Sequence, residues 1–300
     1  MVVNCKYIIF WYYIMNLTKS NGLENNLVKT IDTFNLPIPR QEVPKPHFTA
    51  LVVAPTGCGK TNLMSNFLGF YQDKQYEEKP IFDCMVLISP SSFPNKMGFK
   101  SENKFDKFKW DEIHSNFSDK TMNLIIKNQE ARIKEYLDYE QDLKTYNQLM
   151  EDSKVENKII IDYFKRFPNL SKPTCRFDRI PTCIICMDDI CNANRQASLS
   201  EFISRSRHLN CSFITAVQAL TQASSHLRQN CSVLILLKTN NSKTLETIYD
   251  EFTCNDFTKD QWQDICKLPE AKQDFIMLDQ KEQDRNKKYR LGFDRFINIM

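Results

Sequence analysis

The chain has 300 residues, of which 42% are hydrophobic and 26% are charged, which is ordinary for a folded globular protein. With 6 glycines and 12 prolines, it has neither a fibrous nor a disordered composition. The net charge of +3 does not by itself indicate a nucleic-acid-binding protein, although a local basic stripe is compatible with it. The 11 cysteines, in a long chain with no convincing secretory signal, predict reduced thiols of a cytosolic or nuclear protein.

A strongly apolar run, YIIFWYYIM, occupies residues 7–15. It is about half as long as a membrane-spanning helix, and no small-residue cleavage site follows it. We expect an extra strand or a tail without fixed structure, ahead of a translation-start artefact and of membrane contact. Residues 16–47 are polar and proline-punctuated. Residues 1–47 are therefore predicted to be an extension without a stable membrane anchor, preceding a main domain at 48–300.

The first motif of the main domain lies between a strand predicted at 48–53 and a helix predicted at 62–70. Its sequence, APTGCGKT at 54–61, fits G-x-x-x-x-G-K-S/T except that Ala54 replaces the first glycine. Between a strand and a helix, such a loop cradles phosphates with consecutive backbone N–H groups. It predicts an ATP site in which Lys60 reaches the phosphates and the Thr61 hydroxyl binds Mg²⁺. The predicted nucleotide-binding residues are Pro55, Thr56, Gly57, Cys58, Gly59, Lys60 and Thr61.

A second buried strand is predicted at 82–88, and the composition then changes. Residues 93–172 are rich in Lys, Glu, Asp and Asn. Large side chains recur there at alternating spacings of three and four for about two heptads. We predict a helical insertion, either a short coiled coil or a helical hairpin, that projects from the core. The stripe consists of Tyr136, Tyr139, Leu143, Tyr146 and Met150.

Strands and helices alternate in the remainder of the chain. This alternation predicts an α/β domain with a mostly parallel sheet that helices cover on both faces. The predicted strands lie at 181–188, 211–217, 233–237 and, as the last, 274–278; the predicted helices lie at 199–208, 220–228, 243–252 and 259–266.

The strand at 181–188 ends in two carboxylates, Asp188 and Asp189. In a nucleotide hydrolase this is the Walker B arrangement, in which Asp188 holds Mg²⁺ through water and Asp189 orients or activates the attacking water. The same strand contains Cys183 and Cys186, which with Cys175 and Cys191 nearby suggest zinc. Residues three apart on a strand point to opposite faces, however, so we disfavour a zinc site.

Polar residues around the next strand complete the predicted site. Gln218 follows the strand at 211–217 and is a candidate sensor of the γ-phosphate. Arg205 and Arg207, beside His208, are equal candidates for an arginine finger supplied to a neighbouring subunit, and Arg195 is a third candidate. A basic residue at a helix C-terminus is also favourable without any such role. The sequence lacks the N-K-x-D motif that would indicate GTP binding, and it lacks the H-R-D and D-F-G motifs of a protein kinase.

These segments together resemble one family. APTGCGKT, the strand followed by SPSS, IICMDD, and above all SRSRHLNCSFITAVQ at 204–218 are similar to the poxvirus-type genome-packaging ATPases of large nucleocytoplasmic DNA viruses, virophages and polinton-like elements. These ATPases belong to the FtsK–HerA superfamily. The resemblance covers about 48–92 and 178–240. Departures from the pattern are Ala54, the long segment at 93–172, and an aspartate rather than a glutamate at 189.

The resemblance implies a RecA-like core with an additional strand between the loop strand and the Walker B strand. It also implies a homo-oligomeric ring that drives double-stranded DNA into a capsid, at the site of virion assembly in the host cytoplasm or nucleus. By position, the resemblance selects Arg207 as the inter-subunit arginine. DNA contact would be to phosphates rather than to bases. Alternatives are another motor, such as a helicase or a secretion or conjugation ATPase, and a nucleotide-controlled assembly scaffold. We call Lys281, Arg285, Lys287, Lys288 and Arg290 the basic tail. These residues either contact DNA or form a solvated charged loop.

Overall fold

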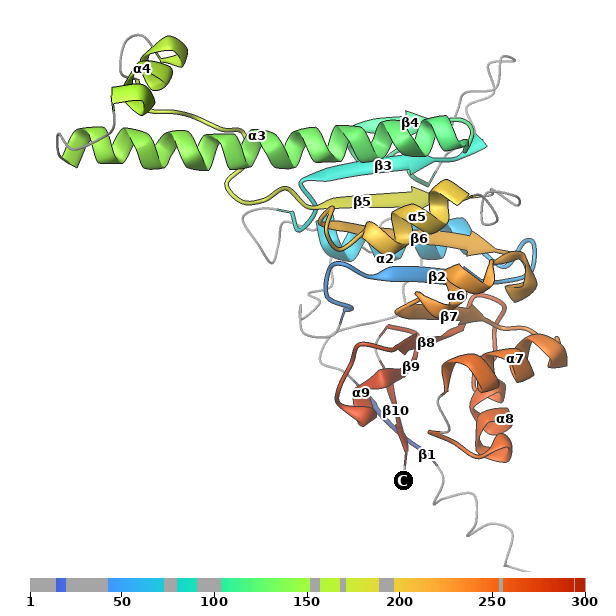
Figure 1. The fold of residues 1–300 in the computed structure, drawn as a ribbon. Helices are drawn as coiled ribbons and strands as arrows, with labels where there is room; N and C mark the ends of the chain where they lie inside the picture. Colours follow the sequence, from blue (N-terminus) through green and yellow to red (C-terminus); the bar gives the residue numbers. More distant parts are fainter. Residues whose placement is uncertain are drawn as a thin grey trace, which may run out of the picture.

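All strands of the described chain belong to one sheet (Figure 1). The computed structural model describes residues 15–19, 43–72, 80–90, 104–151, 157–167, 171–188, 197–253, 256–293 and 295–299. Within these residues the sheet has ten strands in the order β1-β10-β9-β8-β7-β2-β6-β5-β3-β4. The predicted α/β fold with a mostly parallel sheet is confirmed.

Six strands form the parallel part of the sheet. Five of them are short, largely apolar runs buried on both faces, as is typical of parallel strands, whereas the edge strand β4 is only partly buried. The strand β6 lies between β2 and β5, so the predicted additional strand between the loop strand and the Walker B strand is confirmed. The six are β2 (Thr49–Val53), β3 (Cys84–Ile88), β4 (Glu112–His114), β5 (Cys183–Met187), β6 (Cys211–Val217) and β7 (Val233–Leu237).

The sheet continues beyond β7 with antiparallel strands: β8 (Phe275–Asp279), β9 (Tyr289–Leu291), β10 (Arg295–Ile299) and β1 (Met15–Lys19). The prediction that 274–278 is the last strand was therefore wrong. A short helix, α9 (Arg285–Lys288), and two further strands follow it. Residues 7–14 of the apolar run lie outside the described residues, but its last residue, Met15, begins β1, which pairs with β10.

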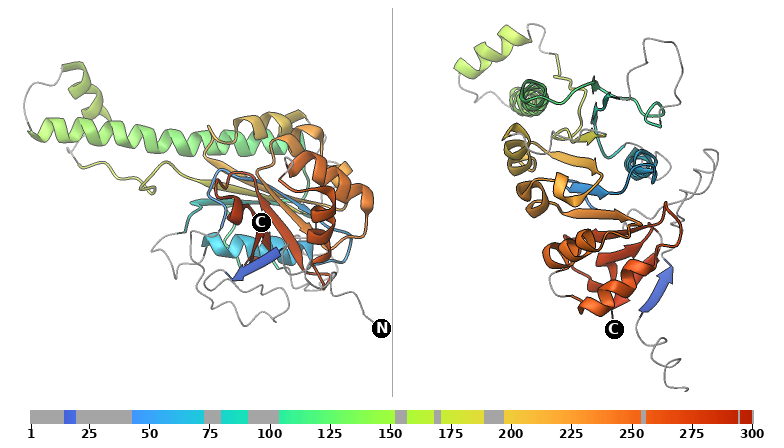
Figure 2. Two further views of the ribbon diagram at one scale, coloured as in Figure 1. Left: turned by 90° about the horizontal axis from the view of Figure 1, so that it is seen from below. Right: turned by 90° about the vertical axis from the view of Figure 1, so that its right-hand side faces the viewer.

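Helices cover both faces of the sheet (Figure 2). On one face, α2 (Lys60–Gln72) buries Leu63, Phe67 and Tyr71 against the strands. The opposite face is covered by the beginning of α3 (Asp119–Glu151) and by α5 (Ala197–Arg205), α6 (Ser225–Gln229), α7 (Ser242–Phe252) and α8 (Lys259–Lys267). In the described part of the chain, no helix combines the length and the apolar composition that crossing a membrane demands.

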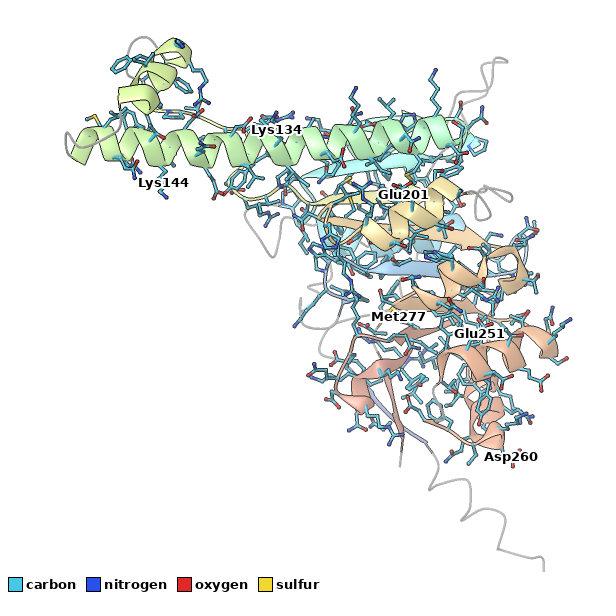
Figure 3. The ribbon with its side chains drawn as sticks, in the orientation of Figure 1. Lys134, Lys144, Glu201, Glu251, Asp260 and Met277 are labelled. Atoms are coloured by element: carbon cyan, nitrogen blue, oxygen red, sulfur yellow. The ribbon has the colours of Figure 1, made fainter. Side chains whose placement is uncertain are left out.

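Only part of the segment predicted as an insertion projects from the core. The strand β4 joins the sheet edge, and the first turns of α3 bury Met122, Ile125 and Gln129. Gln129 donates hydrogen bonds to the carbonyls of Pro181 (2.8 Å) and Leu209 (3.1 Å), which fixes α3 to the loops before β5 and β6. The second half of α3 then extends past the sheet, where Figure 3 shows Lys134 and Lys144.

The projecting half of α3 carries the short helix α4 (Asn157–Arg166), so this arm is a helical hairpin rather than a coiled coil. Arg166 binds the largely buried Asp142 of α3, with Nη2 lying 2.7 Å from Oδ1. Tyr163, also buried, donates a hydrogen bond to the carbonyl of Ser171 at 3.0 Å. Several apolar side chains of the arm remain exposed, including Leu137, Met150 and Ile161.

Candidate nucleotide-binding site

The predicted phosphate loop follows β2 directly. Ala54 continues the parallel pairing with β6, since its N–H donates to the carbonyl of Val217 at 3.1 Å. Gly57 and Gly59 then adopt φ angles of 76° and 85°, in the left-handed region where a side chain would strain the backbone. The helix α2 begins at Lys60, so the free N–H groups of its first turn lie at the loop. This conformation fits a bound phosphate chain.

The Lys60 side chain folds back over its own loop. Its exposed fraction is 9%, and its ammonium donates to the carbonyls of Ala54 (3.3 Å) and Pro55 (3.5 Å). Both acceptors are neutral, and a phosphate oxygen makes a stronger, charge-assisted bond with an ammonium than a carbonyl does. Lys60 is thus held where its ammonium can replace its hydrogen bonds to two carbonyls with hydrogen bonds to the phosphates of a nucleotide.

The two predicted metal ligands meet in the structure. The Thr61 hydroxyl donates to Oδ2 of Asp188 at 2.8 Å, although the residues lie 127 positions apart. Asp188 is completely buried at the end of β5, where its N–H donates to the carbonyl of Ile88 at 3.0 Å. A hydroxyl beside a carboxylate is the oxygen donor set that Mg²⁺ takes together with phosphates and water. The residues present therefore fit Mg²⁺, which would neutralise charge on the phosphates.

Gln218 lies between the phosphate loop and the Walker B carboxylate. It follows Val217, which pairs with Val53 at the end of β2, while β5 borders β6 on its other side. Its side chain is exposed, and its N–H donates to Oε1 of Gln222 at 2.8 Å. Sequence reasoning missed Gln222, a residue four positions later that holds the turn after β6. Asp189, the predicted water-activating residue, lies outside the described residues.

The two described arginine candidates differ in their partners. Arg205, at the end of α5, binds Glu130 (2.9 Å) and Glu201 (3.2 Å). Arg207 is exposed in the turn that follows, and no ion pair involves it in the parts of the chain that are described. This difference favours Arg207 as the side chain available to another subunit. Arg195, the third candidate, lies outside the described residues.

The structure does not bring Arg207 together with its own phosphate loop. Arg207 precedes β6, whereas the loop joins β6 at its last residue, Val217. The seven residues of β6 span about 20 Å at about 3.3 Å per residue. Arg207 thus lies at the opposite edge of the sheet from the phosphate loop of its own chain.

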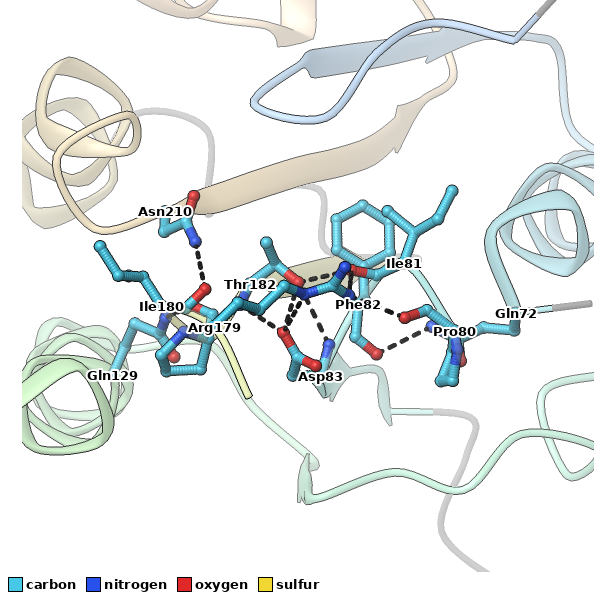
Figure 4. A network of polar contacts seen from close by, with 11 residues as sticks. Gln72, Pro80, Ile81, Phe82, Asp83, Gln129, Arg179, Ile180, Thr182 and Asn210 are labelled. Carbon is cyan, nitrogen blue, oxygen red and sulfur yellow. Dashed lines mark hydrogen bonds and ion pairs between the residues drawn. The ribbon is translucent and has the colours of Figure 1, made fainter. Parts of the chain in front are cut away.

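A hydrogen-bond network lies at the edge of the sheet where β3, β5 and β6 begin (Figure 4). Asp83 Oδ2 accepts from the N–H and the hydroxyl of Thr182, both at 2.9 Å, and from Arg179 Nε at 3.3 Å. Asn210, which has a left-handed φ of 53°, donates from its side chain to the carbonyl of Ile180 at 2.9 Å. These contacts join the loops that precede β3, β5 and β6.

We expect Asp83→Ala to lower the free energy of unfolding by about 2 kcal/mol, because it removes the acceptor of three donors in a partly buried network. Urea denaturation followed by circular dichroism measures this change. Asp106→Ala, at an exposed position, is the matched control. A loss for Asp83→Ala no larger than that of the control would show that the network contributes nothing to stability.

The two cysteines that suggested zinc point to opposite faces of β5. Cys183 belongs to the core cluster on the α5 side of the sheet, and Cys186 to the cluster on the α2 side. A hydrogen bond with Cys211, together with burial, raises the pKa of the Cys183 thiol, and burial raises that of the Cys186 thiol, so both are protonated in the core. No group of metal-binding side chains with the make-up of such a site occurs among the residues that the structure describes.

The basic tail is not a uniform charged strip. Arg285 and Lys288 both bind Asp256, at 3.0 and 2.6 Å. Arg290 has an exposed fraction of 1%, and its guanidinium lies 5.0 Å from the centre of the Phe296 ring. Arg285 and Lys288 thus join α9 to the segment before α8, and Arg290 packs between β9 and β10. Lys281 and Lys287 are the two exposed lysines of the set.

Neither a family model nor a curated protein matches the sequence. Solved structures do resemble it in fold. The genome-packaging NTPase B204 of Sulfolobus turreted icosahedral virus 2, in complex with AMP, has a TM-score of 0.45 and 10% identity, over 83% of this chain and 98% of that chain. The pCW3 conjugation coupling protein TcpA has a TM-score of 0.42 and 14% identity, over 94% of this chain and 64% of that chain. EssC of Geobacillus thermodenitrificans has a TM-score of 0.41 and 13% identity, over 84% of this chain and 39% of that chain.

Proposed function

We propose that this chain is a Mg²⁺-dependent ATPase and the subunit of a ring-shaped motor that translocates double-stranded DNA. The observation that carries this proposal is the pairing of Thr61 with Asp188 beside a left-handed glycine loop. Lys60 would hold the phosphates, while Thr61 and Asp188 would hold the ion that the phosphates share.

The position of Gln218 supports a motor rather than a small nucleotide kinase. Gln218 ends a strand inserted between the loop strand and the Walker B strand, within reach of a γ-phosphate that both of them bind. In a motor, such a residue couples the loss of the γ-phosphate to movement of the strand that carries it. The other end of this strand bears the turn with Arg207, which faces a neighbouring subunit in a ring.

We further propose that the motor packages a viral or virus-like genome into a capsid. The segment 204–218, with its arginine-rich turn, strand and glutamine, supports this assignment through its resemblance to packaging ATPases. The chain would act at the site of virion assembly, in the host cytoplasm or nucleus. It would contact DNA phosphates without sequence preference and dock on a capsid or portal-like partner.

The test is the rate of ATP hydrolysis with and without linear duplex DNA, together with the mass of the oligomer. We expect a ring whose hydrolysis rises several-fold with duplex DNA, and an effect that weakens as salt increases, because phosphate contacts release counterions. Single-stranded DNA of equal length is the control. Stimulation by single strands alone would indicate a helicase instead, and a nucleotide-binding ring without hydrolysis would indicate an assembly scaffold.

A further inference from the structure

Three basic side chains gather at the edge of the sheet opposite the phosphate loop. His47 precedes β2, Arg207 precedes β6 and Lys281 follows β8. The Lys281 ammonium donates to the carbonyl of His47 at 2.5 Å, and the N–H of His47 donates to the Ser212 hydroxyl at 2.8 Å. These contacts fix Lys281 to the first residues of β6, beside the turn that carries Arg207.

The charges of this cluster repel one another. The pKa of Lys281 is lowered by burial and then by the charge of Arg207. The pKa of His47 is lowered by burial, by Lys281 and by Arg207, so the imidazole is neutral at pH 7. Arg207 and Lys281 are therefore close enough to interact, and keeping two cations together costs free energy that a bound anion would recover.

Asp279 is the carboxylate whose charge acts on Lys281, but no ion pair joins the two side chains in the described chain. Asp279 is buried, with an exposed fraction of 5%, and burial is the main reason that its pKa is raised. One of its oxygens accepts the backbone N–H of Lys281 at 3.0 Å rather than the ammonium. No ion pair of Arg207 or Lys281 occurs in the described ranges of the chain, although nearby cations such as Arg205 and Lys288 are paired.

The backbone at this edge is also held in an unusual conformation. His47 has a φ of 66°, which a non-glycine residue rarely adopts. This conformation directs the His47 carbonyl to Lys281 while its N–H remains bound to Ser212. Strained residues of this kind persist where the surrounding contacts impose them. The contacts here hold Lys281 at the exposed edge where Arg207 also lies.

We propose that Lys281 acts with Arg207 as a second cation, and that the pair binds the phosphates of the nucleotide held by the neighbouring subunit. This inference rests on the proposed ring ATPase. A head-to-tail ring places one edge of each subunit against a different edge of the next. The phosphate loop and this cluster occupy opposite edges of the sheet, so each interface would join the loop of one subunit to the cluster of its neighbour.

The test begins with Lys281→Ala, for which we expect kcat to fall by about 10- to 100-fold, because it removes a charge that stabilises the transition state. KM for ATP should change little, since the nucleotide is bound by the other subunit's loop. Lys281→Arg should restore most of the activity. Lys45→Ala is the matched control, an exposed lysine that precedes β2 at the same edge and is expected to hydrolyse ATP at the wild-type rate.

Mixing two kinds of variant subunit distinguishes a role of Lys281 across the subunit interface from a structural role within its own subunit. Lys281→Ala subunits have an intact loop, and Lys60→Ala subunits have an intact cluster. Co-assembled at equal amounts, they should restore activity at about one interface in four, where an intact loop faces an intact cluster. Equal activity of Lys281→Ala and Lys45→Ala, or no recovery on mixing, would overturn the proposal while leaving the ATPase assignment intact.

Two further outcomes are distinguishable. If Lys281→Ala hydrolyses ATP normally without DNA but binds linear duplex DNA more weakly, the cluster contacts DNA phosphates instead of a nucleotide and the inference is wrong. If the wild-type protein assembles but does not hydrolyse ATP, the proposed function fails, and the role of Lys281 fails with it. Oligomer mass, measured for every variant, identifies losses of activity that come from failed assembly.

Discussion

Lys60→Ala should reduce the rate of ATP hydrolysis by at least about 10³-fold, because it removes the only loop side chain that brings a positive charge to the phosphates. The ammonium donates only to the Ala54 and Pro55 carbonyls, and no described partner outside the loop depends on it. We therefore expect the free energy of unfolding to change by less than about 1 kcal/mol. Steady-state phosphate release and urea denaturation measure the two quantities.

Lys45→Ala is the control for this variant, since Lys45 is exposed and precedes β2, whereas the loop follows the other end of this strand. It should hydrolyse ATP at the wild-type rate. Binding of an ATP analogue should weaken in Lys60→Ala and not in Lys45→Ala. Undiminished hydrolysis by a folded Lys60→Ala protein would mean that the segment 54–61 is not the catalytic phosphate loop, and the proposed function would fall with it.

The loop was predictable because its requirements are local. A short apolar strand, glycines at two positions with positive φ, and a helix starting at Lys60 all lie within one continuous segment. The approach of Asp188 to Thr61 could also be expected, because parallel strands deliver their carboxyl ends to the same edge of a sheet. The order of β2, β6 and β5 followed from the resemblance and not from periodicity.

Contacts between distant segments were not predictable in the same way. The lysine-rich segment before β9 appeared to be a loop or a DNA contact, but Asp256 pairs with Lys288 from 32 positions away and fixes it to the core. The first half of α3 has the same polar composition as the arm, yet it packs on the sheet. The contact of Lys281 with His47 joins residues 234 positions apart, so no local pattern indicates it.

Arg207→Ala should have the second large effect, a loss of about 10³-fold or more in kcat, which is the scale of an arginine that stabilises the transferring phosphoryl group from another subunit. The matched control is Arg205→Ala. Arg205 is bound to Glu130 and Glu201 on its own subunit, and ion pairs exposed to this extent contribute about 1 kcal/mol or less. Arg205→Ala should therefore be folded and close to wild type in hydrolysis.

If Arg207 acts on the site of a neighbouring subunit, its variant should show more than a loss of activity. An Arg207→Ala subunit keeps its loop and its Thr61–Asp188 pair, so it should bind an ATP analogue as tightly as the wild type. Its activity should return when it is co-assembled with Lys60→Ala, because each subunit supplies the half of the site that the other lacks. Arg207 lies about 20 Å from its own loop, across the length of β6, and a side chain cannot span that distance. Full activity of Arg207→Ala in an intact ring would place the finger elsewhere, and recovery on mixing would place it at the subunit boundary.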